Sequence, residues 1–90
     1  MDVEFDDEKR RRILDERGLD IARAEEIFDG AELSWIDDRQ DYGETRWNTF
    51  GSLDGRLVAL SWTIRNGRRR IISMRKANDR EQARYRKTLD

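Results

Sequence analysis

The 90-residue chain contains no cysteine, no histidine and no proline. Without cysteine it has no disulfide framework, no thiolate nucleophile and no thiolate metal site. The absence of histidine excludes imidazole as a general base and excludes the zinc sites built from cysteine and histidine. Any catalysis must therefore depend on arginine, lysine, aspartate, glutamate or tyrosine, and we expect neither a metal nor an organic cofactor.

Long apolar runs are missing as well. No segment approaches the roughly 18 consecutive apolar residues of a membrane-spanning helix, and the acidic start, 1–6, has no apolar stretch behind it of the kind found in secretory signals. We therefore expect a cytoplasmic protein that has no membrane partner. The length suits one small domain, residues 1–90. A Gly-rich phosphate loop, HExxH, an EF-hand loop and a Ser/His/Asp set are all absent.

The charge is abundant but segregated along the chain. Charged residues make up 43% of the sequence, with a formal net charge of −1. Up to Gly55 there are 8 Lys and Arg against 17 Asp and Glu, which gives −9, and from Arg56 onward there are 11 against 3, which gives +8. Such asymmetry indicates a surface built for a polyanion. The alternative is that the two halves neutralise each other inside the fold.

Apolar periodicity and turn signals predict an α+β domain in which one layer of helices packs on a sheet. Two N-terminal helices are expected, the first ending at Gly18 and the second running from a cap at Asp20 to Asp29-Gly30. An antiparallel meander and a closing helix follow. The expected strands and final helix are Val3–Phe5, a short piece around Leu33 and Trp35, Glu44–Gly51, Arg56–Arg65, Arg69–Arg75 and the helix Asp79–Leu89, with hairpin turns at Asp54-Gly55 and Asn66-Gly67.

The meander has one polar face that carries hydroxyl and guanidinium groups. Its members are Ser61, Thr63, Arg65, Ser73 and Arg75, with Arg46 in reach from the first strand. Arginines held on a sheet can bind phosphate oxygens through two parallel hydrogen bonds. The alternative is an ordinary solvated face of an antiparallel sheet.

The closing helix places Glu81 and Tyr85 one turn apart. A tyrosine near arginine can stack on a base or donate a proton, and a carboxylate can accept one. Alternatively, Tyr85 packs in the fold and Glu81 pairs with Arg84 or Lys87. Trp62 lies on the apolar face of its strand, whereas Trp35 and Trp47 belong either to the core or to a partner surface.

The order and spacing of these residues resemble the BrnT family, small toxins of bacterial type II toxin–antitoxin modules. The matching segments are Phe5-Asp6-Asp7-Glu8-Lys9, Gly18, Ile27-Phe28-Asp29, Gly43-Glu44-Thr45-Arg46, Gly55-Arg56-Leu57, Thr63-Ile64-Arg65 and Arg70–Ala77, followed by Glu81 and Tyr85. The sequence departs from the family pattern at Ile13, Glu16-Arg17, Ile21 and Met74, where the family has Asn, Lys-His, Phe and Ala.

The resemblance implies a RelE-like fold and a metal-independent endoribonuclease activity that stops translation. It also implies a BrnA-like ribbon-helix-helix antitoxin as partner, with toxin and antitoxin forming a heterotetramer that represses its own promoter. The expected ligands are RNA, free or on the ribosome, and operator DNA only through the antitoxin.

The resemblance also suggests roles for individual residues. Cleavage by the ribose 2′-hydroxyl needs charge stabilisation on the phosphate and proton transfer at two oxygens. Arg65 and Arg75 would clamp the scissile phosphate, and Lys9 would bind the backbone or assist proton transfer. Glu44 or Glu81 would be the base, and Tyr85 would stack a base or donate a proton. The residues expected to bind RNA are Arg46, Arg70, Ser73 and Lys76.

Two other functions stay open at this point. One is a non-catalytic translation inhibitor that occupies RNA or the ribosome. It predicts the same salt-sensitive RNA binding as a nuclease, but only the nuclease produces new RNA ends. The other is a small nucleic-acid-binding scaffold module, which predicts operator binding by this chain alone, although the sequence contains no helix-turn-helix and no basic region.

Overall fold

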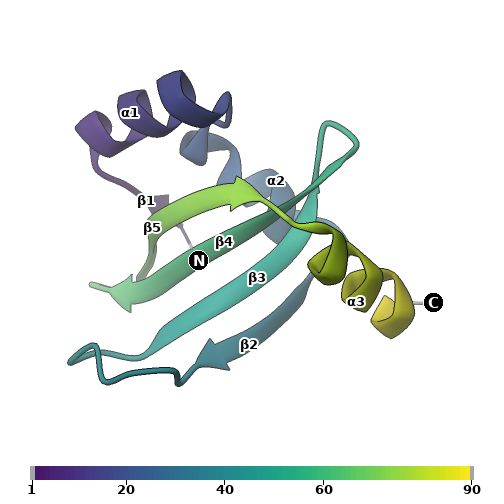
Figure 1. Cartoon of the computed structure of the whole chain (residues 1–90). Coiled ribbons are helices and arrows are strands. Elements are labelled where there is room, and N and C mark those ends of the chain that lie inside the picture. The colour runs from purple at the N-terminus through teal and green to yellow at the C-terminus, as the bar shows by residue number, and fades with distance from the viewer. Residues whose placement is uncertain (1, 90) are drawn as a thin grey trace.

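The fold is a five-stranded sheet packed against helices (Figure 1). The structure is a computed structural model, and it describes residues 2–89. The elements in chain order are β1 (Val3–Glu4), α1 (Asp7–Arg17), η1 (Ile21–Arg23), α2 (Ala24–Asp29), β2 (Leu33–Asp37), β3 (Arg46–Leu53), β4 (Arg56–Arg65), β5 (Arg68–Lys76) and α3 (Asp79–Leu89). The α+β class is thereby confirmed. Within these residues, no helix is both long enough and apolar enough to cross a membrane.

The sheet is mixed: the predicted antiparallel meander is confirmed, and β1, for which the sequence predicts no partner, adds a parallel strand at one edge. The strand order is β1-β5-β4-β3-β2, and β2 to β5 pair with their sequence neighbours in antiparallel fashion. β1 pairs with β5 in parallel, with Val3 opposite Arg69 and Glu4 opposite Arg70. α1, η1 and α2 lie within the long connection that a parallel pair requires. A strand of two residues carries no periodicity from which its partner could be predicted.

The predicted helix end at Gly18 and the predicted cap at Asp20 are confirmed, and Asp6 caps α1. The Asp6 carboxylate accepts a hydrogen bond of 3.0 Å from the backbone N–H of Lys9, and Asp20 accepts one of 3.0 Å from that of Ala22. α1 ends at Gly18, whose φ of 68° is the left-handed conformation that glycine adopts without strain. The second predicted helix differs in detail, because it begins as the 3₁₀ turn η1 and continues as α2.

The core lies between the sheet and α1, η1 and α2. Ile13, Ile21 and Ile27 from these helices are buried against the apolar stripe of β4, which includes Val58 and Leu60. Helix α2 comes so close to Gly51 of β3 that a Cβ atom at position 51 would collide with Cγ2 of Ile27. Burial of this one sheet face supplies most of the apolar stabilisation of a chain this small.

A β-bulge in β5 reverses the alternation of its side chains. Ser61 pairs with Ser73 but Trp62 pairs with Ile71, which leaves Ile72 as the extra residue. Because of this residue, Ile71 and Met74 both face the helices and are buried. Ser73 and Arg75 consequently lie on the opposite, open face of the sheet.

The sequence predicts a single layer of helices, but the last helix does not lie in one layer with α1 and α2. α3 leaves the end of β5 and lies beside the open face (Figure 1). Its Glu81 contacts Arg75 and its Arg84 lies over the ring of Trp35. The helix therefore forms a wall of the open face.

Candidate active site on the open face of the sheet

The open face contains a cavity of about 430 Å³ between β2 and α3. Its floor is formed by side chains of the central strands, and β2 and α3 supply its two sides. Residues that line it include Trp35, Asp37, Arg39, Asn48, Phe50, Ser61, Ser73, Arg75, Glu81 and Arg84. The size lies within the range of pockets that hold small ligands.

Arg75 and Glu81 form a bidentate ion pair on the wall of the cavity. Arg75 donates from Nη1 to Oε1 of Glu81 at 2.7 Å and from Nη2 to Oε2 at 2.8 Å. Glu81 also accepts a bond of 2.9 Å from the backbone N–H of Asn78, whose side chain accepts from the Glu81 N–H at 2.8 Å. This reciprocal cap of α3 fixes the carboxylate in place.

The pair also sets the protonation state of its members. The hydrogen bond from Arg75 is the main cause that lowers the pKa of Glu81, and burial opposes it. The same bond raises the pKa of Arg75. At neutral pH the site therefore holds a carboxylate and a guanidinium in contact. The Glu81 side chain is 20% exposed and the Arg75 side chain is 48% exposed.

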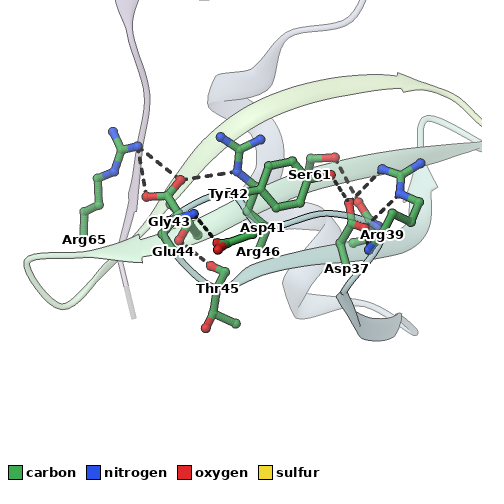
Figure 2. A network of polar contacts seen from close by, with 12 residues as sticks. Asp37, Arg39, Asp41, Tyr42, Gly43, Glu44, Thr45, Arg46, Ser61 and Arg65 are labelled. Atoms are coloured by element: carbon green, nitrogen blue, oxygen red, sulfur yellow. Dashed lines mark hydrogen bonds and ion pairs between the residues drawn. The ribbon is translucent and has the colours of Figure 1, made fainter.

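A second cluster on the same face has Glu44 between two arginines (Figure 2). Its carboxylate accepts from Nη2 of Arg65 at 3.2 Å and from Nε of Arg46 at 3.3 Å. Burial raises the pKa of Glu44, but the hydrogen bonds and charges of Arg65 and Arg46 together outweigh it, so the net shift is downward. The guanidinium of Arg46 lies 4.1 Å from the ring centroid of Tyr42.

Asp37 is a buried carboxylate that connects this cluster to the cavity. Its side chain is 3% exposed and accepts from Arg39 at 2.7 and 2.8 Å and from the Tyr42 hydroxyl at 3.1 Å. These bonds, that of Arg39 first, hold the pKa of Asp37 well below its usual range. Because Tyr42 contacts both Asp37 and Arg46, one continuous network runs from Arg65 to Arg39 (Figure 2).

The cavity also offers an aromatic surface and neutral polar groups. Trp35 packs edge-on against Phe50 with ring centroids 4.7 Å apart, and the guanidinium of Arg84 lies 4.9 Å from the Trp35 centroid. Ser61 Oγ donates to Oδ1 of Asn48 at 2.9 Å. Such a surface can stack a planar ring while the amide and hydroxyl groups bind its polar edge.

The structure groups some of the predicted site residues and separates others. Arg75, Glu81 and Ser73 line the cavity, and Arg65, Arg46 and Glu44 form the neighbouring cluster. Of the alternatives for Glu81, pairing with Arg84 or Lys87 is replaced by pairing with Arg75. Arg70 lies on the same face, with its Nη1 3.8 Å from Glu4.

Lys9, Lys76 and Tyr85 lie outside the cavity. Lys9 belongs to the first turn of α1, where the hydrogen bond from its backbone N–H is the main cause that lowers the pKa of Asp6; burial opposes this, and the charges of Arg70 and Lys9 add smaller lowering effects. Lys76 follows Arg75 in β5, so the alternation directs it to the other face. The Tyr85 hydroxyl donates to the carbonyl of Ala31 at 2.7 Å, and its ring lines a separate hollow of about 210 Å³. Their roles stay predictions.

Sequence reasoning missed Asp37, Arg39, Tyr42 and Asn48 as members of the site. The acidic loop and the tyrosine were visible in the sequence, but nothing in their spacing shows which carboxylate is buried. The polar residue Asn48 alternates with Trp47 in β3, and this alternation is the one local signal that could have placed it on the face of Arg46.

Comparisons with known proteins identify the family of the chain. A search among curated proteins finds no match. The family profile described as "Ribonuclease toxin, BrnT, of type II toxin-antitoxin system" matches residues 5–81. This range includes both arginine clusters and ends at Glu81, and membership implies a protein antitoxin as partner. The chain belongs to the BrnT family of ribonuclease toxins from type II toxin–antitoxin systems.

Proposed function

We propose that this toxin is an endoribonuclease whose active site is the cavity on the open face, and that it stops translation by cleaving single-stranded RNA. The observation that carries the proposal is the Arg75–Glu81 pair on the cavity wall. A guanidinium that binds a carboxylate through two bonds can bind a phosphate in the same geometry. The pair therefore places a group that can bind phosphate, Arg75, beside a group that can accept a proton, Glu81.

The reaction that fits these groups is transfer of the phosphoryl group to the neighbouring 2′-hydroxyl. The 2′ oxygen attacks phosphorus, the bond to the 5′ oxygen breaks, and the products are a 2′,3′-cyclic phosphate and a new 5′-hydroxyl end. Arg75 stabilises the charge that develops on the phosphate. Glu81 accepts the 2′ proton, and the leaving 5′ oxygen gains one from solvent or from an acid of the protein, for which Lys9 and Tyr85 stay predictions.

Exchange of partners at Arg75 prepares Glu81 for this task. In the free protein the bond from Arg75 keeps the pKa of Glu81 low, which makes it a weak base. When Arg75 turns to the phosphate, that bond is lost and the phosphate adds negative charge nearby. Both changes raise the pKa of Glu81 and so make it a better base at the moment when substrate is present.

The remaining groups of the open face would hold the RNA on either side of the scissile bond. Trp35, backed by Phe50, can stack an unpaired base, and Asn48 and Ser61 can bind its edge. Arg65 and Arg46 can exchange Glu44 for the next phosphate, and Arg70 extends the basic surface. A duplex would keep its bases stacked away from Trp35, which favours single-stranded RNA as the substrate.

The finer implications of the family belong to the same proposal. We infer a RelE-like arrangement, supported by the helices on one sheet face and the closing helix at the end of β5. The partner would be a BrnA-like ribbon-helix-helix antitoxin in a heterotetramer that contacts operator DNA through the antitoxin. The toxin would act as one domain in the cytoplasm, without a metal.

The test uses the purified chain and a 5′-labelled single-stranded RNA in buffer with EDTA. Wild type should produce discrete fragments with 5′-hydroxyl and 2′,3′-cyclic phosphate ends. Arg75→Ala should lower the cleavage rate by about 10² or more, and Arg65→Ala should lower it less. Arg11→Ala, at an exposed position of α1, is the matched control and should cleave as wild type does.

Two results would refute the proposal. The first is full cleavage by both Arg75→Ala and Arg65→Ala. The second is wild-type protein that binds RNA and arrests translation without new RNA ends, which would make it an inhibitor by occupancy.

A further inference from the structure

The helical layer does not cover the whole of its sheet face. Phe28 of α2 packs edge-on against Trp62 with ring centroids 5.3 Å apart, and large apolar side chains of the helix-side face beyond this contact are exposed. Ile36 and Ile64 are 57% and 43% exposed there. Trp47 is half-buried, lies opposite both Ile36 and Trp62 in the strand register, and stacks on Trp62 at 4.9 Å. Large apolar side chains gathered on an uncovered part of the helix-side face indicate an interaction site.

Arg69 lies on the same face without an acidic partner. It is opposite Ile64 in the register, and its guanidinium lies 3.9 Å from the centroid of Phe28 and 5.1 Å from that of Trp62. Within residues 2–89 its Nε is buried and has no hydrogen-bond partner. A guanidinium that lies among aromatic rings and has no carboxylate within the described residues favours a partner that brings one to its accessible edge.

We propose that these four residues, Ile36, Trp47, Ile64 and Arg69, form a docking face for the antitoxin. The bound segment places apolar side chains over Ile36, Trp47 and Ile64 and a carboxylate on Arg69. Tryptophan and arginine are the residue types that most often dominate binding energy at protein interfaces. The inference rests on the antitoxin partner proposed above and is independent of ribonuclease activity.

The orphan guanidinium distinguishes this occupant from a second copy of the chain. In a symmetric dimer the same patch meets itself, so Arg69 would face apolar residues or another Arg69. Neither arrangement supplies the missing acceptor. An acidic and apolar segment from a different protein supplies both requirements.

Trp47, Ile64 and Arg69 lie on the sheet face opposite to the cavity, whereas Ile36 on the edge strand β2 also lines the cavity, so the two functions can be separated by mutation at Ile64 or Arg69. Ile64 and Arg69 project toward the helix side, whereas Arg75 and Glu81 lie on the open side. Substitutions at Ile64 or Arg69 should therefore change antitoxin binding and leave RNA cleavage as it is.

The experiment measures the affinity of the full chain for the antitoxin encoded beside it, with both proteins purified. Ile64→Glu should weaken binding by about 30-fold or more, because it introduces a negative charge where the partner is acidic and removes an apolar contact. Arg69→Met, which keeps an apolar side chain over Phe28, should weaken binding about tenfold. Leu14→Glu on α1 is the matched control, since Leu14 is also 43% exposed, and should stay within about threefold of wild type.

Thermal unfolding and RNA cleavage are measured on the same four proteins. The proposal is overturned if Ile64→Glu and Arg69→Met bind the antitoxin as Leu14→Glu does, or if the antitoxin does not bind wild type. It is also overturned if the isolated chain is a dimer that Ile64→Glu converts to monomer, because the face would then belong to a second copy. Loss of antitoxin binding by Ile64→Glu in a protein without nuclease activity would support the docking face and refute only the proposed function.

Discussion

Replacing Glu81 with Gln tests the exchange of partners at Arg75 most directly. Gln keeps the size of the side chain and an oxygen that can accept from the Asn78 N–H, so the cap of α3 is retained. The substitution removes the negative charge and the proton acceptor. Arg75 then has no anionic partner in the free protein, since Glu81 is the only ion-pair partner of Arg75 within residues 2–89.

The structure predicts opposite effects on binding and on cleavage. A negative charge about 4 Å from a bound phosphate costs about 1 kcal/mol even in bulk water, so its removal should tighten RNA binding about fivefold. Loss of the general base should lower the cleavage rate by about 10² to 10⁴. Because Arg75 is 48% exposed, the loss of the pair should cost no more than about 1 kcal/mol of stability.

The assay combines single-turnover cleavage with binding of an RNA in which 2′-deoxy substitution at the cleaved position prevents reaction. In wild type the rate should rise with pH through the pKa of Glu81 in the complex and then level off, since the deprotonated form is the base. Glu81→Gln should lose this pH dependence. Wild-type cleavage by Glu81→Gln, or weaker RNA binding than wild type, would refute the reasoning.

Three further predictions concern the stability of the fold. Asp37→Asn should lower the free energy of unfolding by about 1 to 3 kcal/mol, because Arg39 and Tyr42 lose an ionised acceptor. Since the pKa of Asp37 is lowered in the folded state, the stabilisation by its carboxylate is complete above the ordinary aspartate pKa and is lost on acidification. The urea midpoint of wild type should therefore fall more steeply below about pH 4 than that of the variant. Gly51→Ala should destabilise by about 1 to 3 kcal/mol, because its Cβ collides with Ile27, and in a double-mutant cycle with Ile27→Ala the two losses should sum to more than the loss in the double variant. Thr49→Val should cost about 1 to 3 kcal/mol and shift the tryptophan emission, because the Trp62 Nε1–H donates to the Thr49 hydroxyl at 2.8 Å and would lose its acceptor, whereas Ser52→Ala at an exposed position of β3 should change neither.

Local signals predicted the individual elements well. The strand Arg56–Arg65 has the bounds expected from alternation, and the last helix spans 79–89 as expected, although its cap is Asn78 and not Asp79 as the sequence predicts. What the sequence could not show depends on contacts between distant segments. The parallel pairing of β1, the bulge at Ile72 and the place of α3 beside the open face are all of this kind.

The sequence predicted which residue types belong to the candidate site better than it predicted which of them contact each other. Arg75 and Glu81 were both expected in it, but as separate groups, since a spacing of six residues across a strand end and a turn indicates no contact by itself. Asp37 was missed, because burial of a carboxylate depends on Arg39 and Tyr42 folding back over it. The assignment of Tyr85 relied on helical spacing, which does not reveal that the Ala31 carbonyl lies within its reach.

The pairing of arginines with carboxylates changes how the charge asymmetry of the sequence is interpreted. Arg65 from the basic half pairs with Glu44 from the acidic half, and Arg75 pairs with Glu81. In the proposed function, RNA would have to displace carboxylates that already neutralise these arginines, and each exchange would release fewer counterions than binding to a bare cation. The affinity of wild type for RNA should fall less steeply with salt than the number of arginine contacts suggests. In Glu81→Gln, where Arg75 is bare, the slope of log K against log salt should steepen by a little under one unit. Equal slopes for the two proteins would show that Arg75 does not exchange Glu81 for phosphate.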